Sequence, residues 1–234
     1  MRSNRKTANA MFLAAIFCLF ITPTSISAQT ASPFGQSIAA FAQGANASVS
    51  GQELLKLHAA GKFEEVRTKA LARIQDAKDD TDAYVGLSWS LVALRRYSEA
   101  ETWARRGYAL NADPRLAQAI GEASYYLGKN ENALQMLQEY IASYPEGLRA
   151  GLSYYLCGEL YIRLAKYMHA DIAFSAALRY NPSNPVWWTR MGWARENCKR
   201  YLQALSAYEQ ALALNPNLAD AVEGRRRIQA RMQG

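Results

Sequence analysis

The chain has 234 residues, of which 50% are hydrophobic and 20% are charged, so it can bury a core and is not disordered by composition. With 3 cysteines and 2 histidines, it is neither a disulfide-stabilised scaffold nor a histidine-rich metal protein. Its formal net charge of +7 falls by three, to +4, without Arg2, Arg5 and Lys6, and a charge of that size does not require a nucleic-acid partner.

Residues 1–28 have the pattern of a secretory signal peptide. Three basic residues come first, an apolar run covers residues 10–21, and Pro23 and small residues follow, so we expect cleavage after Ser27 or Ala28. Twelve apolar residues rise about 18 Å as a helix, which is too short for a hydrocarbon core of about 30 Å. The pattern therefore predicts an exported protein, with an uncleaved membrane anchor as the alternative.

Residues 29–46 are rich in Ala, Ser, Gly and Gln, a composition typical of a linker. Ser32 and Pro33 are suited to begin a short helix within this segment. We therefore expect either a linker or a short N-terminal helix between the signal peptide and the rest of the chain.

Residues 151–184 and 185–218 align as two copies of a pattern 34 residues long. The matched pairs are Tyr154 with Trp188, Cys157 with Met191, Gly158 with Gly192, Tyr167 with Tyr201, Ala170 with Ala204, Phe174 with Tyr208, Ala177 with Ala211 and Pro182 with Pro216. Apolar residues spaced three or four apart predict two helices in each copy, with small residues where helices approach closely. Asn184 followed by Pro185 predicts a helix start, and the matched prolines predict where each second helix ends.

With this pattern the chain resembles a tetratricopeptide-repeat protein. Three weaker copies precede the two strong ones, at residues 47–80, 81–113 and 114–150, the first being the weakest match and the third carrying three extra residues. The resemblance implies an all-α fold, a right-handed superhelical solenoid of about five helix-turn-helix repeats, because one repeat cannot bury its apolar face alone. Residues 219–234 are expected to form a C-terminal capping helix, whose arginines keep the end of the array soluble or contact an anionic partner.

The sequence contains no phosphate-binding loop, no Gly-x-Ser-x-Gly elbow and no His-Glu-x-x-His motif, and we therefore expect no enzyme activity, no cofactor and no metal. His58 and His169 lack a spaced cysteine or carboxylate partner and are expected to be ordinary packing or surface side chains. Cys157 and Cys198 are expected to lie about 10 Å apart along neighbouring helices, beyond the reach of a disulfide, so both should be unpaired.

In the tetratricopeptide-repeat family the first helix of each repeat lines a concave groove. Carried over residue by residue, the family's groove positions give these candidate partner-binding residues: Trp89, Gln118, Glu122, Tyr125, Tyr155, Glu159, Arg163, Arg190, Trp193 and Asn197. The resemblance also implies that Trp89, Glu122, Glu159 and Trp193 share one inner stripe, with aromatic ends and a solvated acidic middle. A partner segment with a basic centre and apolar flanks would suit such a stripe.

The resemblance implies an adaptor that binds a protein or peptide partner in this groove, in a bacterial periplasm or after secretion. Envelope biogenesis, secretion and polysaccharide export are typical settings for such proteins. Two alternatives stay open. One is a small apolar or amphipathic ligand in the aromatic groove, and the other is self-association, in which the groove of one copy takes an end of another.

Overall fold

The computed structural model describes residues 49–233, and in this part of the chain all regular secondary structure is α-helical. The helices are α2 (Val49–Ala59), α3 (Phe63–Asp76), α4 (Thr81–Ala93), α5 (Tyr97–Leu110), α6 (Pro114–Tyr126), α7 (Asn130–Ser143), α8 (Ala150–Arg163), α9 (Tyr167–Tyr180), α10 (Pro185–Asn197), α11 (Tyr201–Leu214) and α12 (Ala219–Gln233). The predicted signal peptide (1–28) and linker (29–46) lie outside this range. None of the described helices is long and apolar enough to cross a membrane.

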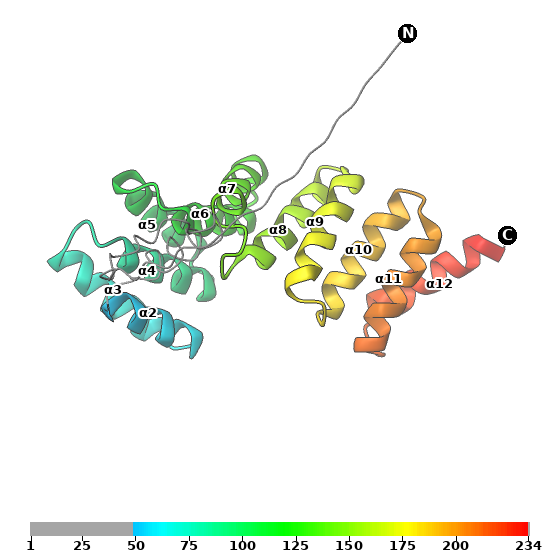
Figure 1. Ribbon diagram of the computed structural model, residues 1–234, viewed down its shortest axis with the longest axis horizontal. Helices are drawn as coiled ribbons and strands as arrows, with labels where there is room; N and C mark the ends of the chain where they lie inside the picture. The colour runs from blue at the N-terminus through cyan, green and yellow to red at the C-terminus, as the bar shows by residue number, and fades with distance from the viewer. Residues whose placement is uncertain (1–48, 234) are drawn as a thin grey trace, which may run out of the picture. The chain divides into compact units, whose positions relative to one another are not determined.

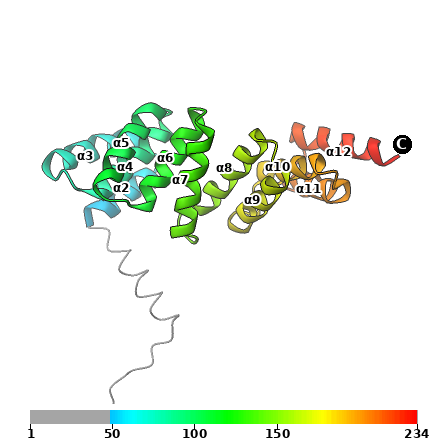
Figure 2. The ribbon, with the colours of Figure 1, turned by 90° about the horizontal axis from the view of Figure 1, so that it is seen from above.

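The described helices follow one another as pairs within one compact unit (Figure 1). Two helices fall within each predicted copy, from α2 and α3 in the first to α10 and α11 in the fifth, and α12 comes after the last pair. The predicted all-α repeat solenoid is therefore confirmed. Figure 2 shows the same succession from above.

The first helices of the pairs form the inner layer of this solenoid. Each of α2, α4, α6, α8 and α10 contacts the next first helix along the chain, and α10 contacts α12. The backbones of the second helices, α3, α5, α7, α9 and α11, do not approach one another this closely in the described residues. Because neighbours lie closer together on the inner side of a curved stack, the array curves toward its first helices, which we call the inner helices. The second helices are the outer helices.

Local sequence signals explain where several helices begin and end. α10 begins at Pro185, as predicted, and the Asn184 side chain accepts hydrogen bonds from the backbone N–H groups of Val186 (3.0 Å) and Trp187 (3.2 Å). This cap satisfies donors that the first turn of a helix leaves free. α9 and α11 end two residues before Pro182 and Pro216, because a proline cannot continue the helix.

The turn within each pair contains one residue with a left-handed backbone. These residues are Gly61, Arg95, Gly128, Ala165 and Lys199, with φ between 55° and 75°. They occupy the same place in all five copies, so the turn geometry repeats along the array. Only Gly adopts this conformation without steric cost, so the turns at Arg95, Ala165 and Lys199 are strained and the packed helices hold them in place.

Glycines allow the two helices of a pair to approach closely where the pattern predicted it. A Cβ atom on Gly158 would lie 2.5 Å from the ring of Phe174, and one on Gly192 would lie 2.9 Å from the ring of Tyr208. Phe174 and Tyr208 are fully buried. The small residue on the inner helix and the aromatic residue on the outer helix are therefore one packing unit, repeated in the last two copies.

Candidate functional site

Ion pairs join each of the inner helices α4, α6, α8 and α10 to the next helix of the inner layer or to the residue that immediately precedes it. We call these four pairs the inner ion-pair ladder: Asp82–Arg115 (2.8 Å), Glu122–Arg149 (2.5 Å), Glu159–Arg190 (2.6 Å) and Glu196–Arg227 (2.9 Å). In every pair the arginine lies further along the chain than the acid: Arg115 and Arg190 belong to the next copy, Arg149 immediately precedes α8, and Arg227 lies in α12. The ladder therefore neutralises acids on the inner face and ties consecutive repeats together.

The carboxylates of the ladder are held in largely buried positions. The Glu122 side chain is 7% exposed, and the Arg149 side chain that pairs with it is 15% exposed. Burial by itself would raise the pKa of Glu196, but hydrogen bonds from Arg227 and Tyr208 outweigh it and hold this pKa below its ordinary value. A buried carboxylate that keeps its charge needs such partners.

The stripe predicted from Trp89 to Trp193 is not present as a binding surface. Trp89 is 3% exposed and lies beneath the Arg149 guanidinium, which is 4.5 Å from the centre of its ring system. Glu122 and Glu159 are buried as well and paired within the ladder. Only Trp193 stays half-exposed. The expected solvated acidic middle is therefore wrong, because Arg149 and Arg190 pair with these two carboxylates.

The other predicted groove residues divide between core and surface. Gln118 is fully buried and donates a hydrogen bond of 2.8 Å to Glu122. Tyr125 lies under the Arg163 guanidinium at 4.0 Å from its ring centre, and Tyr155 stacks on Trp187 with ring centres 5.3 Å apart. These residues stabilise the inner helices, and neither of the two hollows described next includes them.

A first hollow, with a volume of about 430 Å³, lies where the inner helices α4 and α6 meet the α4–α5 turn, the start of α5 and the residue before α8. We call it the N-terminal hollow, and its lining residues are Val92, Ala93, Arg95, Tyr97, Glu122, Tyr126 and Arg149. The rings of Tyr97 and Tyr126 stack with centres 4.4 Å apart. Arg95 is exposed, and among the described residues it has no ion-pair partner. The hollow therefore offers one free cation beside an aromatic surface.

A second hollow lies at the end of the array, with a volume of about 330 Å³. We call it the C-terminal hollow, and its lining residues are Thr189, Arg190, Trp193, Glu196, Asn197, Tyr208, Asp220, Glu223 and Arg227. Arg227 and Glu223 come from α12, so the capping helix completes this surface. Asp220 is exposed and forms no ion pair in the described part of the chain. The free charge here is therefore an anion, opposite in sign to the one in the N-terminal hollow.

The arginines of α12 are less available than the sequence suggested. Arg227 binds Glu196 at 2.9 Å, and Arg226 binds Glu223 at 2.7 Å. Arg231 lies 5.8 Å from the ring centre of Tyr201. Through these contacts α12 packs against the last repeat. The three arginines named here are therefore less available to an anionic partner.

Residues 185–218 match the model of the tetratricopeptide repeat. This match identifies the last predicted copy as a tetratricopeptide repeat. The fold of the chain is similar to that of PilF from Pseudomonas aeruginosa, with a TM-score of 0.66, 19% identity, and coverage of 79% of this chain and 83% of that one. It is also similar to YrrB, a tetratricopeptide-repeat protein with an unusual peptide-binding site (TM-score 0.60, 15% identity, coverage 83% and 98%).

A structure of MamA gives a TM-score of 0.59 at 23% identity, covering 65% of this chain and 82% of that one. At these identities the likeness shows the fold of the tetratricopeptide-repeat array and leaves its partner open. The comparison with curated proteins found no match.

Within this tetratricopeptide-repeat array, the structure brings only some of the predicted site residues into the hollows. Arg190, Trp193 and Asn197 share the C-terminal hollow, and Glu122 lies in the N-terminal hollow. Sequence reasoning missed other lining residues: Arg95, Tyr97, Arg149, Asp220 and Arg227. A signal for Arg95 was available, because it stands where other copies of the tetratricopeptide repeat have Gly61 or Gly128.

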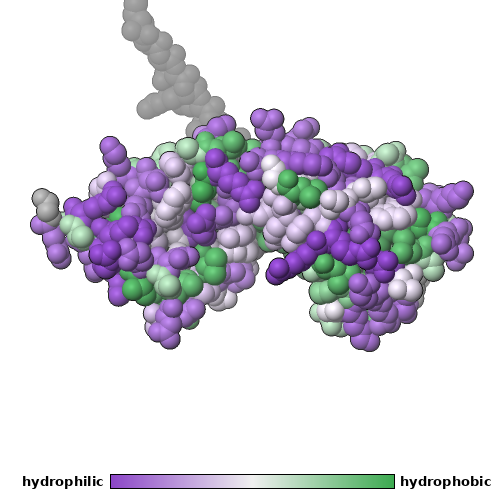
Figure 3. Space-filling view, turned by 180° about the vertical axis from the view of Figure 1, so that it is seen from behind, coloured by the Kyte–Doolittle hydropathy of each residue, from purple (hydrophilic) through white to green (hydrophobic). Residues whose placement is uncertain are grey.

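The described residues contain no group of His, Cys, Asp or Glu side chains that could hold a metal ion. Cys157 is buried and Cys198 half-buried, and both carry free thiols. Burial raises the pKa of Cys157 to about 12, so this thiol is neutral and a poor nucleophile. The face drawn in Figure 3 is mainly hydrophilic, with small separate apolar patches.

Proposed function

We propose that this chain is an exported adaptor that binds a segment of a partner protein along its inner face. The main support for this proposal is the pair of hollows, each of which contains one exposed charge that the ladder does not neutralise. Arg95 provides a cation in the N-terminal hollow, and Asp220 provides an anion in the C-terminal hollow. Because the ladder fixes the inner helices, this surface is preformed, which lowers the entropy cost of binding.

The charges of the two hollows define the partner segment that fits best. Its acidic side chains face Arg95, and its basic side chains face Asp220. An aromatic or aliphatic side chain would pack on the exposed Tyr97–Tyr126 stack in the N-terminal hollow. The charged lining of both hollows favours a polypeptide over the small apolar ligand that the sequence left as an alternative.

Export rests on the signal-peptide pattern of residues 1–28. We propose that the chain acts in a bacterial periplasm or after secretion, in envelope biogenesis, secretion or polysaccharide export. N-terminal sequencing of the protein from its producing cells should begin near Ala28 or Gln29. An intact Met1 on protein recovered from the cytoplasm would contradict export while leaving the adaptor proposal in place.

The adaptor proposal is tested by reversing both free charges, with Arg95→Glu and Asp220→Lys in one variant. Partners crosslinked in intact cells should be recovered with the wild-type protein and largely lost with the variant. Because both side chains are exposed and unpaired, circular dichroism and melting should stay close to wild type. Arg179→Glu is a matched control, since Arg179 is exposed on the outer helix α9. Equal recovery with all three proteins would place the binding surface elsewhere.

A further inference from the structure

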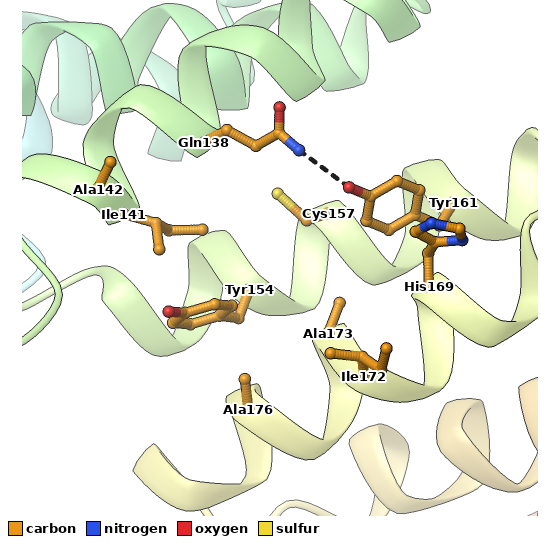
Figure 4. A pocket seen from close by; sticks show the side chains of 10 residues that line it. All are labelled: Gln138, Ile141, Ala142, Tyr154, Cys157, Tyr161, His169, Ile172, Ala173 and Ala176. Atoms are coloured by element: carbon orange, nitrogen blue, oxygen red, sulfur yellow. Dashed lines mark hydrogen bonds between the residues drawn. The ribbon is translucent and has the colours of Figure 1, made fainter.

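A third hollow lies on the opposite side of the array, between the outer helices α7 and α9, with α8 as its floor (Figure 4). Its volume is about 280 Å³, and we call it the outer apolar pocket. The side chains that give it its character are Ile141, Tyr154, Cys157, Tyr161, Ile172 and Ala176. None of the inner-face residues described above takes part in it.

The pocket is open because α7 and α9 lack the side-chain hydrogen bonds that join the preceding two outer helices, α5 and α7. Between α5 and α7, the Tyr108 hydroxyl donates a hydrogen bond to Glu139, and Arg105 donates one of 3.1 Å to Asn132. The equivalent residues one repeat later are Ile141 for Tyr108, Ala176 for Glu139, Gln138 for Arg105 and His169 for Asn132.

All four of these equivalent residues line the pocket. Among the described residues no hydrogen bond or ion pair joins α7 to α9, whereas Gln138 donates to the Tyr161 hydroxyl of α8 at 2.9 Å. The substitutions therefore remove both bridges and leave an opening that runs down to α8.

The lining of the pocket is suited to an uncharged group. It contains no Lys, Arg, Asp or Glu, in contrast to both inner hollows. Of its polar side chains, Gln138 donates a hydrogen bond to Tyr161, and the His169 ring lies 5.3 Å from the Tyr161 ring. A charged group placed here would lose water without gaining a partner, whereas an apolar group would bury apolar surface on three sides.

We infer that the outer apolar pocket binds one aromatic or branched aliphatic side chain of a partner protein. The absence of charge from the pocket selects an apolar anchor, and its volume exceeds that of the engineered apolar cavity of about 150 Å³ that accommodates benzene. Ile172, on the rim, is 68% exposed. A free molecule inside the pocket leaves Ile172 in water, whereas a polypeptide that carries the anchor covers it. Anchors of this kind dominate the energetics of many protein interfaces.

The inference is tested with protein labelled at isoleucine methyl groups and titrated with N-acetyl-phenylalaninamide, an uncharged side chain with its amide groups. The methyl signals of Ile141 and Ile172 should shift saturably. Those of Ile120 and Ile228, buried in other parts of the array, should not. The amide should bind more tightly than toluene, because its amide groups cover the open side. Tighter binding of toluene would overturn a protein anchor in favour of a free apolar molecule.

A variant that restores the missing bridge supplies the decisive comparison. Ile141→Tyr with Ala176→Glu copies the Tyr108–Glu139 contact, should fold, and should weaken the response of Ile172 by at least about tenfold. Leu202→Tyr with Ala213→Glu puts the same residue types at exposed positions of α11 and should bind like wild type. If the first variant does not fold, Ala142→Trp closes the pocket from an exposed position. Unchanged binding by the closed protein, or no binding by wild type, would overturn the inference.

Discussion

The Arg149 guanidinium donates a hydrogen bond of 2.5 Å to the Glu122 carboxylate of α6. Arg149 immediately precedes α8, where the third copy has its three extra residues, and its side chain also covers the Trp89 ring. One side chain therefore links the inner helices α4 and α6 to the start of α8. Trp89 and Glu122, which the sequence predicted as binding residues, therefore stabilise the packing of the array.

Removing Arg149 should destabilise the array strongly. Arg149→Met leaves Glu122 buried without its cation, and such a loss costs roughly 3–5 kcal/mol of unfolding free energy. Urea unfolding followed by circular dichroism measures it. The double variant Arg149→Met with Glu122→Gln should recover much of the loss, because no uncompensated charge remains. Equal losses in the single and double variants would mean that the ion pair is not the cause.

Charge reversal at Glu122 and Glu159 should also unfold or destabilise the protein. From the sequence alone these carboxylates were expected to be solvated, so that Glu122→Lys with Glu159→Lys would leave the fold intact. In the structure each new lysine would face an arginine of the ladder, Arg149 or Arg190, in a largely buried position. A melting temperature within one or two degrees of wild type would contradict this expectation.

Adding a methyl group at Gly158 should disrupt the closest helix contact of the fourth repeat. Gly158→Ala places its Cβ against the buried ring of Phe174, and overpacking of this kind costs roughly 1–3 kcal/mol. Thermal unfolding is the measurement. Phe174→Leu in the same protein should recover part of the loss by making room. A Gly158→Ala protein as stable as wild type would show that the helices can separate freely.

Relieving a left-handed residue should stabilise the array. Ala165 has φ 55° and Gly128 has φ 75° at the same place in neighbouring copies. Ala165→Gly removes the steric cost and should add about 0.5–1 kcal/mol to the unfolding free energy. Gly128→Ala should lose about 1 kcal/mol, although a Cβ there meets no atom within 4 Å. Changes of the same sign in both variants would contradict the conformational explanation.

The Glu196 carboxylate should make stability depend on acid pH. Its pKa in the folded protein lies below the ordinary 4.5, so its contribution is fully present above about pH 4.5 and is lost as the pH falls through the folded value. Melting temperatures of wild type and Glu196→Gln should therefore differ most near neutral pH and converge on acidification. A difference that grows as the pH falls would show that the pKa is raised instead.

The fold was largely predictable because its signals are local and repeated. Gly158 and Gly192, Phe174 and Tyr208, and the Asn184 and Pro185 pair recur at fixed spacing or cap a helix by their own chemistry. Each acts within a helix or between the two helices of a repeat. A family pattern that records residue size at each position therefore describes them well.

The inner surface was decided by contacts between repeats, which that pattern does not record. Whether Glu122 faces solvent depends on Arg149, which lies 27 residues further along the chain, within the three extra residues of the third copy. Whether an outer gap is closed or open depends on pairs such as Tyr108 with Glu139 and Ile141 with Ala176. The helices and their stacking follow from periodicity and capping, which can be read along the chain. Which charges are free and which gaps between outer helices are open depends on the folded array, because long side chains reach across neighbouring helices.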